Sequence, residues 1–186
     1  MDSTALPLEG ARVITPAVFS DDRGFFKEVY SASRYRSIGI ADDFVQDNVS
    51  ESRAWTLRGL HSDPRMAKLV QVLEGEAYDV LVDIRRESPT YLRWCGVHLS
   101  AGSHRQVYLP PGFLHGFLAL SERVIFSYKQ SAEYDSASEI AVTWDDPDLA
   151  IDWPLAEAAP LLSPRDEKNP TLRELGYAIG PATKER

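Results

Sequence analysis

The sequence predicts an all-β fold, in which many short strands form a sandwich or a barrel with a few short peripheral helices. Three observations lead to this prediction: β-branched and aromatic runs, alternation of apolar and polar residues within them, and turn-forming residues about every 8–12 positions. The chain has 186 residues, a length that an all-β barrel can use as one unit. We therefore expect a single domain over residues 1–186, with residues 176–186 as a loosely ordered tail.

The clearest β signal is a hairpin over residues 68–85. In its second arm one face carries Tyr78, Val80, Val82 and Ile84, and the other carries Asp79, Leu81, Asp83 and Arg85. The residues Glu74 and Gly75 stand where a hairpin should turn. Further strands are expected over residues 11–15, 93–99, 106–109, 124–129 and 139–143, and short helical turns over 31–37 and 171–175.

The composition excludes some partners. The net charge is −8 and the sequence pI is about 5.0, which argues against nonspecific binding to nucleic acid or to an anionic membrane. A local cluster of Arg and Lys could still bind a small ligand that carries phosphate. The single cysteine, Cys95, allows no intrachain disulfide. We expect a cytoplasmic protein, because no leader pattern and no membrane-length apolar run is visible.

Two of the histidines indicate a pocket. The four histidines stand at positions 61, 98, 104 and 115. Those at 98 and 104 fit ordinary surface roles, whereas His61 and His115 each belong to a glycine-containing stretch, 57–61 and 110–117. Glycine permits unusual backbone conformations or the close approach of a ligand, so we expect irregular backbone at both stretches. Together the two histidines point to one site.

Five other residues are candidates for that site, although each also fits a structural role. Lys68 opens an apolar strand, where a lysine is uncommon unless its ammonium has a task or a path to solvent. Tyr128 fits a barrel-lining aromatic, and Asp166 fits a solvated turn carboxylate. Arg23 and Arg58 each stand beside a glycine, which suits bidentate contact with phosphate.

A metal site is not expected from these histidines. Small β-barrels that bind a metal use a His-x-His pair with a Glu at short spacing. His61 is followed by Ser62 and Asp63, and His115 is followed by Gly116. The sequence therefore predicts chemistry without a metal and without any other cofactor.

Eleven segments together carry a family resemblance. They are residues 22–28, 46–50, 57–61, 68–72, 82–85, 88–90, 111–117, 127–129, 144–147, 153–154 and 162–166. In number, order and spacing they resemble the dTDP-4-dehydrorhamnose 3,5-epimerase family of cupin-fold enzymes over nearly the whole chain. The resemblance implies a cupin-type β-barrel, or jelly roll. It also implies inversion of C3, C5 or both in a nucleotide-linked 4-keto-6-deoxy sugar.

The resemblance implies four catalytic residues: His61, Lys68, Tyr128 and Asp166. By this likeness His61 is the base, Asp166 its partner, and Tyr128 the acid across the sugar ring. A C–H bond beside a ketone is weakly acidic, and a histidine can remove its proton near neutral pH. Charge then develops on the C4 oxygen, which the Lys68 ammonium would stabilise.

The resemblance also implies substrate-binding residues: Arg23, Phe25, Glu28, Gln46, Asn48, Arg58, His115 and Tyr134. Among them Arg23 resembles a phosphate contact, and Tyr134 resembles the aromatic that packs on the nucleotide base. The family is dimeric with N-terminal strand exchange. We therefore expect a homodimer in which Arg23 and Phe25 serve the partner's site.

One departure from the family pattern leaves alternatives open. The segment 62–67, between His61 and Lys68, is shorter than the corresponding loop of the family. This shortening resembles a branch that acts on GDP-linked 4-keto-6-deoxy heptoses in surface-polysaccharide pathways. Two alternatives of other classes are a sugar-nucleotide-binding cupin without turnover and a metal-dependent cupin isomerase or oxygenase. The presence of all four reactive residue types argues against the binder without turnover, and elemental analysis would test the metal-dependent alternative.

Overall fold

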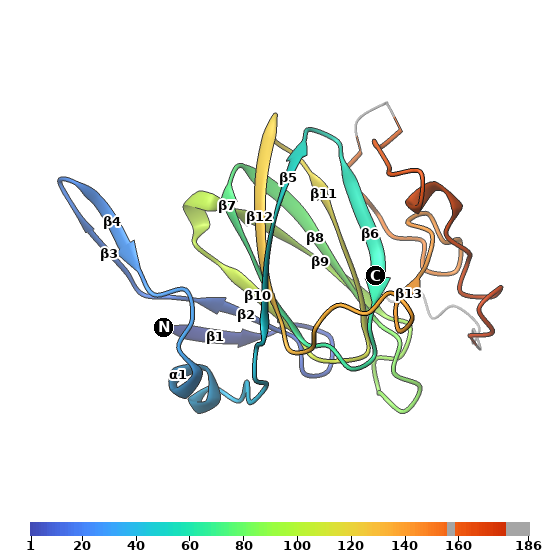
Figure 1. The fold of residues 1–186 in the computed structure, drawn as a ribbon, viewed down its shortest axis with the longest axis horizontal. Coiled ribbons are helices and arrows are strands. Elements are labelled where there is room, and N and C mark those ends of the chain that lie inside the picture. Colours follow the sequence, from blue (N-terminus) through green and yellow to red (C-terminus); the bar gives the residue numbers. More distant parts are fainter. Residues whose placement is uncertain (156–158, 178–186) are drawn as a thin grey trace.

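The computed structural model describes residues 1–155 and 159–177, and its regular structure is almost entirely β-strand (Figure 1). Two antiparallel sheets face each other, with an inner core between them. The predicted all-β, jelly-roll class is confirmed.

The larger sheet has six strands in the order β1-β2-β10-β7-β12-β5. Their bounds are β1 Asp2–Ala5, β2 Arg12–Thr15, β5 Gln46–Arg53, β7 Lys68–Glu74, β10 Gln106–Leu109 and β12 Arg123–Gln130. The central strand β7 pairs with β10 on one side and β12 on the other. Apart from β1 and β2, neighbours in this sheet are distant in sequence, so the register brings remote residues together.

The smaller sheet has five strands in the order β13-β6-β11-β8-β9. Their bounds are β6 Leu57–Ser62, β8 Glu76–Asp83, β9 Trp94–Ser100, β11 Phe113–Ala119 and β13 Ile140–Ala141. C-terminal segments cover its outer face. There Trp153 and Leu172 belong to a second buried cluster, separate from the core between the sheets.

The remaining regular structure of the described residues is a separate hairpin and three short helices. Strands β3 Val18–Asp21 and β4 Gly24–Lys27 pair with each other and project away from the facing sheets (Figure 1). The helices are α1 Ala32–Ser37 and the 3-10 turns η1 Ala101–Ser103 and η2 Asp166–Lys168. No helix in the described part of the chain is long and apolar enough to cross a membrane.

Most of the elements expected from local patterns are present. The hairpin over 68–85 appears as β7 and β8, with Gly75 between them at a φ of 80°. The strands expected at 11–15, 93–99, 106–109 and 124–129, and the helical turn at 31–37, are also confirmed. The tail expected over 176–186 lies largely outside the described residues.

Two expected elements differ from the structure. The strand predicted over 139–143 is reduced to β13, which pairs only with the end of β6 at His61 and Ser62. The turn predicted over 171–175 forms a single α-turn bond from the Leu175 N–H to the Thr171 carbonyl at 3.2 Å. After β13, Val142 still exchanges two hydrogen bonds with Leu60, but Thr143 donates to the Pro170 carbonyl instead of continuing along β6.

His61 and His115 lie in strands, β6 and β11, and the expected irregular backbone is present within them. The Gly59–Leu60 peptide is cis, Gly59 has a φ of 137°, and the register of the two strands shifts between His115 and Phe117. The glycines in these stretches permit the two strands to approach closely. A Cβ built on Gly59 would lie 2.6 Å from the Cα of Gly116. In this register His61 stands directly opposite His115.

We predict that Gly116→Ala destabilises the protein, because its Cβ would lie 2.8 Å from the Arg58 carbonyl oxygen. Overpacking of this kind costs about 1–3 kcal/mol in the free energy of unfolding. Denaturant titration measures it. The matched control is Gly102→Ala, whose Cβ meets nothing within 4 Å and should change stability little. Equal stability of the two variants would contradict a close contact between β6 and β11.

Candidate active site

His61 and Asp166 form a hydrogen-bonded pair. His61 lies on β6, and Asp166 opens η2 more than 100 residues later, yet His61 Nε2 lies 2.7 Å from Asp166 Oδ1. An ionised carboxylate can only accept, so Nε2 carries the hydrogen and Nδ1 is left to take up a proton. Ser163 Oγ and Asn169 Nδ2 also donate to Asp166, at 2.9 and 3.3 Å.

The environment keeps Asp166 ionised. Burial acts to raise the pKa of this carboxyl group. Hydrogen bonds from His61, Ser163 and Asn169, together with the charge of His61, outweigh burial and hold the pKa below its usual value. A carboxylate in this position fixes the tautomer of His61 and stabilises the imidazolium that forms on proton uptake.

A second histidine–carboxylate pair lies beside the first. His115 Nε2 lies 2.7 Å from Asp79 Oδ1, and both side chains are buried. The same argument as for His61 leaves the Nδ1 of His115 as the free ring nitrogen. The other oxygen of Asp79 has no hydrogen-bond partner among the described residues. Asp79 thus reaches the interior beside His115, where its charge also favours the protonated form of Lys68.

Lys68 and Tyr128 lie on the facing sheet. In the register Lys68 is opposite Gln130, and Tyr128 is opposite Val70. Because side chains alternate along a strand, Lys68 points to the same inner face as Val70, and Tyr128 to the same inner face as the buried Phe126. The rings of Phe126 and Tyr128 lie 6.5 Å apart on this face.

Buried surroundings shift the pKa of both groups. Burial lowers the pKa of Lys68 to about 8, against the opposing charges of Glu139, Asp79 and Asp63. Burial raises the pKa of Tyr128; the charge of Glu139 acts in the same direction, while that of Arg58 opposes it. His115, which stands opposite His61, lies 6.1 Å from the Phe126 ring, and Phe126 lies 6.5 Å from the Tyr128 ring. The inner faces that carry His61 and Tyr128 therefore meet in one space between the sheets.

Polar side chains line the rest of this space. Arg58 donates through Nε to Ser52 Oγ and through its terminal nitrogen to the Glu51 carbonyl, both at 3.0 Å, which ties β6 to β5. Gln46 donates to Asn48 at 2.9 Å, and Asn48 to Gln130 at 3.0 Å.

Tyr134 lies at the rim of the same space. Its backbone N–H donates to Gln46 Oε1 at 2.9 Å, which anchors it to β5. The residue is 53% exposed. An anchored, exposed aromatic ring is available to stack on a planar ligand group.

Three predicted binding residues lie apart from this group in the same chain. Arg23 is at the turn of the β3–β4 hairpin, where it pairs with Asp21 at 2.6 Å. Phe25 packs against His104 with ring centroids 4.6 Å apart, and Glu28 pairs with Arg34. Figure 1 shows this hairpin on the far side of the sheets from β6.

Two carboxylates of the site, Asp79 and Glu139, are not predicted from the sequence. An Asp within an apolar strand is a signal that could have indicated Asp79, because such residues are rarely buried without a partner. Glu139 has no comparable local signal, since it reaches the site through the nonlocal pairing of β13 with β6. Within residues 1–155 and 159–177, no group of three or more His, Cys, Asp or Glu is arranged to hold a metal ion.

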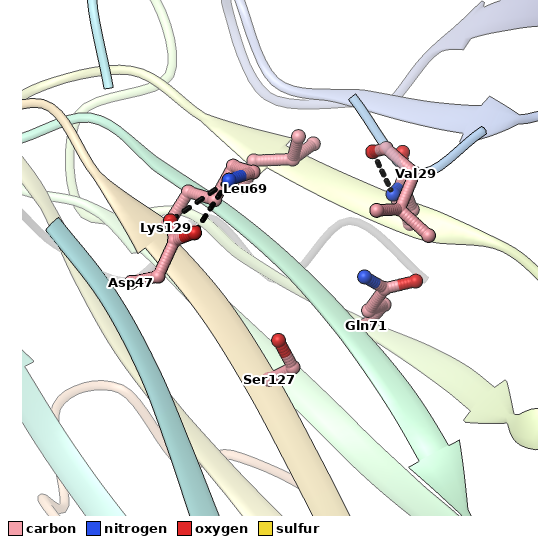
Figure 2. Close-up of a pocket in the computed structure, with 7 residues that line it drawn as sticks. Val29, Asp47, Leu69, Gln71, Ser127 and Lys129 are labelled. Carbon is pink, nitrogen blue, oxygen red and sulfur yellow. Dashed lines mark hydrogen bonds and ion pairs between the residues drawn. The ribbon is translucent and has the colours of Figure 1, made fainter. Parts of the chain in front are cut away.

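A separate depression lies on the outer face of the six-stranded sheet (Figure 2). Ser127 and Lys129 line it, and they alternate with the inward-facing Tyr128 along β12. Lys129 pairs there with Asp47 at 2.8 Å. The sheet thus separates this depression from the group around His61.

Facing β-sheets that hold a carboxylate-supported histidine, a buried lysine and an inward tyrosine define a cupin-type enzyme suited to proton abstraction beside a carbonyl. Comparisons with known proteins agree with this class. The family model described as dTDP-4-dehydrorhamnose 3,5-epimerase matches residues 5–174. This chain belongs to the dTDP-4-dehydrorhamnose 3,5-epimerase family, and it is an epimerase.

Individual relatives are similar over most of their length. The dTDP-4-dehydrorhamnose 3,5-epimerase of Pseudomonas aeruginosa is 46% identical over 90% of this chain and 94% of its own. That of Methanothermobacter thermautotrophicus is 44% identical over 90% and 92%. The structure of the Legionella pneumophila dTDP-6-deoxy-D-glucose-3,5-epimerase, solved in complex with dTDP-4-keto-L-rhamnose, superimposes with a TM-score of 0.90 at 42% identity, covering 99% of both chains.

We predict that Asp166→Asn lowers kcat by about 10²–10⁴-fold with a much smaller change in KM, because the amide no longer fixes the His61 tautomer. Steady-state kinetics measure both constants. Ser163→Ala, which removes only one of the donors to Asp166, should cost far less. A large rise in KM at unchanged kcat for Asp166→Asn would contradict the assignment.

We predict that activity falls as the pH rises through about 8, because the buried ammonium of Lys68 then loses its proton. The pKa of Tyr128 is raised, so the phenol stays protonated over this range. Lys68→Arg should extend the alkaline limb, since Arg keeps its charge.

Unfolding would not explain this loss of activity at high pH. The pKa of Lys68 in the folded state lies below its ordinary value of 10.5, so between about pH 8 and 10.5 the unfolded state binds more protons and the contribution of Lys68 to stability rises. A pH profile of kcat/KM recorded beside thermal melts separates the two effects. A profile that stays flat to a pH well above 8 would contradict the role of Lys68.

Proposed function

We propose that this protein inverts C3, C5 or both in a dTDP-linked 4-keto-6-deoxy sugar, with His61 as the base. The observation that carries the proposal is the 2.7 Å bond from His61 Nε2 to Asp166, which leaves Nδ1 to take up a proton. Each inversion needs a base on one face of the sugar ring and an acid on the other.

In this mechanism Nδ1 of His61 removes the proton beside the C4 ketone, and Asp166 stabilises the resulting imidazolium. The negative charge moves to the C4 oxygen, where the Lys68 ammonium donates a hydrogen bond to it. His115, whose Nδ1 carries no hydrogen, would contact the sugar as an acceptor. Tyr128 then delivers a proton to the carbon from the opposite face. The C4 ketone of the substrate makes the neighbouring C–H bond acidic enough for this step.

The nucleotide end of the substrate would lie toward the rim. Arg58, Gln46 and Asn48 offer donors along the inner face, which suits the diphosphate and the sugar hydroxyls. The exposed ring of Tyr134 would pack on the base. A cytoplasmic location is also proposed, and the buried free thiol of Cys95 accords with a reducing compartment.

We further propose a homodimer in which the β3–β4 hairpin completes the partner's site. The hairpin exposes Phe19 and Phe26, at 65% and 69%, and their pairing places both on one face. On the outer face of the six-stranded sheet Val49 and Leu73 are 66% and 45% exposed. Exposed apolar surface of this kind indicates a binding surface for protein, and a second copy would also bring Arg23 to the phosphates.

The first test is proton NMR in D₂O with dTDP-4-keto-6-deoxyglucose and, separately, a GDP-linked 4-keto-6-deoxy heptose. We expect solvent deuterium to enter C3 and C5 of the dTDP sugar. Entry at C3 alone identifies a single-centre epimerase. Exchange only with the GDP heptose would contradict the dTDP assignment and favour the short-loop branch. Binding without exchange of either compound would favour a non-catalytic binder.

The second test is complementation between Arg23→Ala and His61→Asn. Each variant alone should lose most of its activity, by about 10-fold or more, because one lacks the phosphate contact and the other the base. In a refolded equal mixture half the dimers are mixed, and one site in each has both residues. The mixture should therefore regain about a quarter of the wild-type sites. No recovery, despite mixed dimers shown by mass spectrometry, would contradict the shared site.

A further inference from the structure

Glu139 spans the distance between the catalytic histidine and the rim. Its Oε1 lies 4.0 Å from Nδ1 of His61, the nitrogen that is free to take up a proton. Its Oε2 accepts a hydrogen bond from the Tyr134 hydroxyl at 3.2 Å and pairs with Arg165. The side chain of Glu139 is only 11% exposed, whereas that of Arg165 is 53% exposed. One carboxylate thus has one oxygen toward the interior and the other toward solvent.

The proposed reaction creates a need for such a group. One inversion moves a proton from the sugar carbon to His61 Nδ1, and another from the Tyr128 hydroxyl to the opposite face of that carbon. The site then holds a protonated His61 and a Tyr128 phenolate. Neither a second inversion nor a new turnover can begin until His61 has lost its proton and Tyr128 has regained one. In the proposed reaction the bound sugar would lie over Nδ1 of His61 and cover its direct path to water.

We propose that Glu139 relays the proton from His61 to solvent between inversions. The inference rests on the proposed roles of His61 and Tyr128. The His61 Nδ1–H bond breaks and an O–H bond forms on Glu139 Oε1, so that both groups become neutral. Rotation of the neutral Glu139 carboxyl group then brings the protonated oxygen to the rim beside Tyr134, where it gives its proton to water. The Tyr128 phenolate takes a proton from water. No electrons are transferred, and water is the only co-reactant.

The contacts of Glu139 Oε2 do not account for the position of Oε1. An ion pair with Arg165 alone would be satisfied at the surface and would not require an oxygen facing His61. A purely structural link to Tyr134 would likewise use only Oε2. A role toward His61 explains where Oε1 lies, and a separation of 4.0 Å permits proton transfer after a small side-chain movement or through one water molecule.

The test is Glu139→Gln, which keeps the shape of the side chain and an acceptor for Tyr134 but cannot carry the proton. Rapid-quench experiments with excess dTDP-4-keto-6-deoxyglucose should give a burst of about one inversion per site at a rate close to wild type. The steady-state rate should then fall by about 10- to 100-fold. Formate or imidazole in the buffer should restore it in proportion to concentration, because a small acid or base can replace the relay.

The matched control is Glu122→Gln, which makes the same change at an exposed glutamate and should leave kinetics unchanged. Thermal melts show whether both variants are folded. Equal slowing of the burst and the steady state without buffer rescue, or unchanged kinetics in Glu139→Gln, would overturn the relay. Absence of any C–H exchange in the wild-type enzyme would instead overturn the proposed function, so the two failures are distinguishable.

Discussion

The close approach of β6 and β11 is the constraint on which the site depends. Gly59 and Gly116 allow the two backbones to approach where any side chain would collide. This contact fixes the register that sets His61 opposite His115. Each histidine then reaches a carboxylate at 2.7 Å from a different part of the chain, Asp166 from a C-terminal turn and Asp79 from β8. The backbone contact therefore determines which ring nitrogens remain free.

Charge balance in the interior follows from this arrangement. The carboxylates of Asp79, Asp63 and Glu139 favour the charged form of Lys68, while burial disfavours it more strongly. The result is an ammonium whose pKa is about 8, which is easily influenced by a new charge nearby. An enolate oxygen beside Lys68 would favour the protonated form further. Lys68 therefore interacts with the C4 oxygen most strongly when negative charge develops there, as transition-state stabilisation requires.

The sequence predicts those parts of the fold that depend on patterns within one short segment. The hairpin of β7 and β8 is predictable because its alternation and Gly75 lie within one short segment. That β6 and β11 are strands is not predictable in this way, because a glycine is equally compatible with a loop and with close contact between two strands. The β3–β4 hairpin escapes prediction, since its phenylalanines face solvent in the single chain. Asp166 is found through family likeness, whereas Glu139 depends on the pairing of β13 with β6, which no local signal reports.

The central claim is that His61 and Tyr128 act on opposite faces of one sugar ring. The most direct measurement is deuterium exchange in D₂O, followed by NMR, for His61→Asn and Tyr128→Phe with dTDP-4-keto-6-deoxyglucose. We expect no exchange without His61. We expect exchange with retained configuration without Tyr128, because the base still removes and returns a proton on its own face. Inversion at the wild-type rate in Tyr128→Phe, or undiminished exchange in His61→Asn, would contradict the claim.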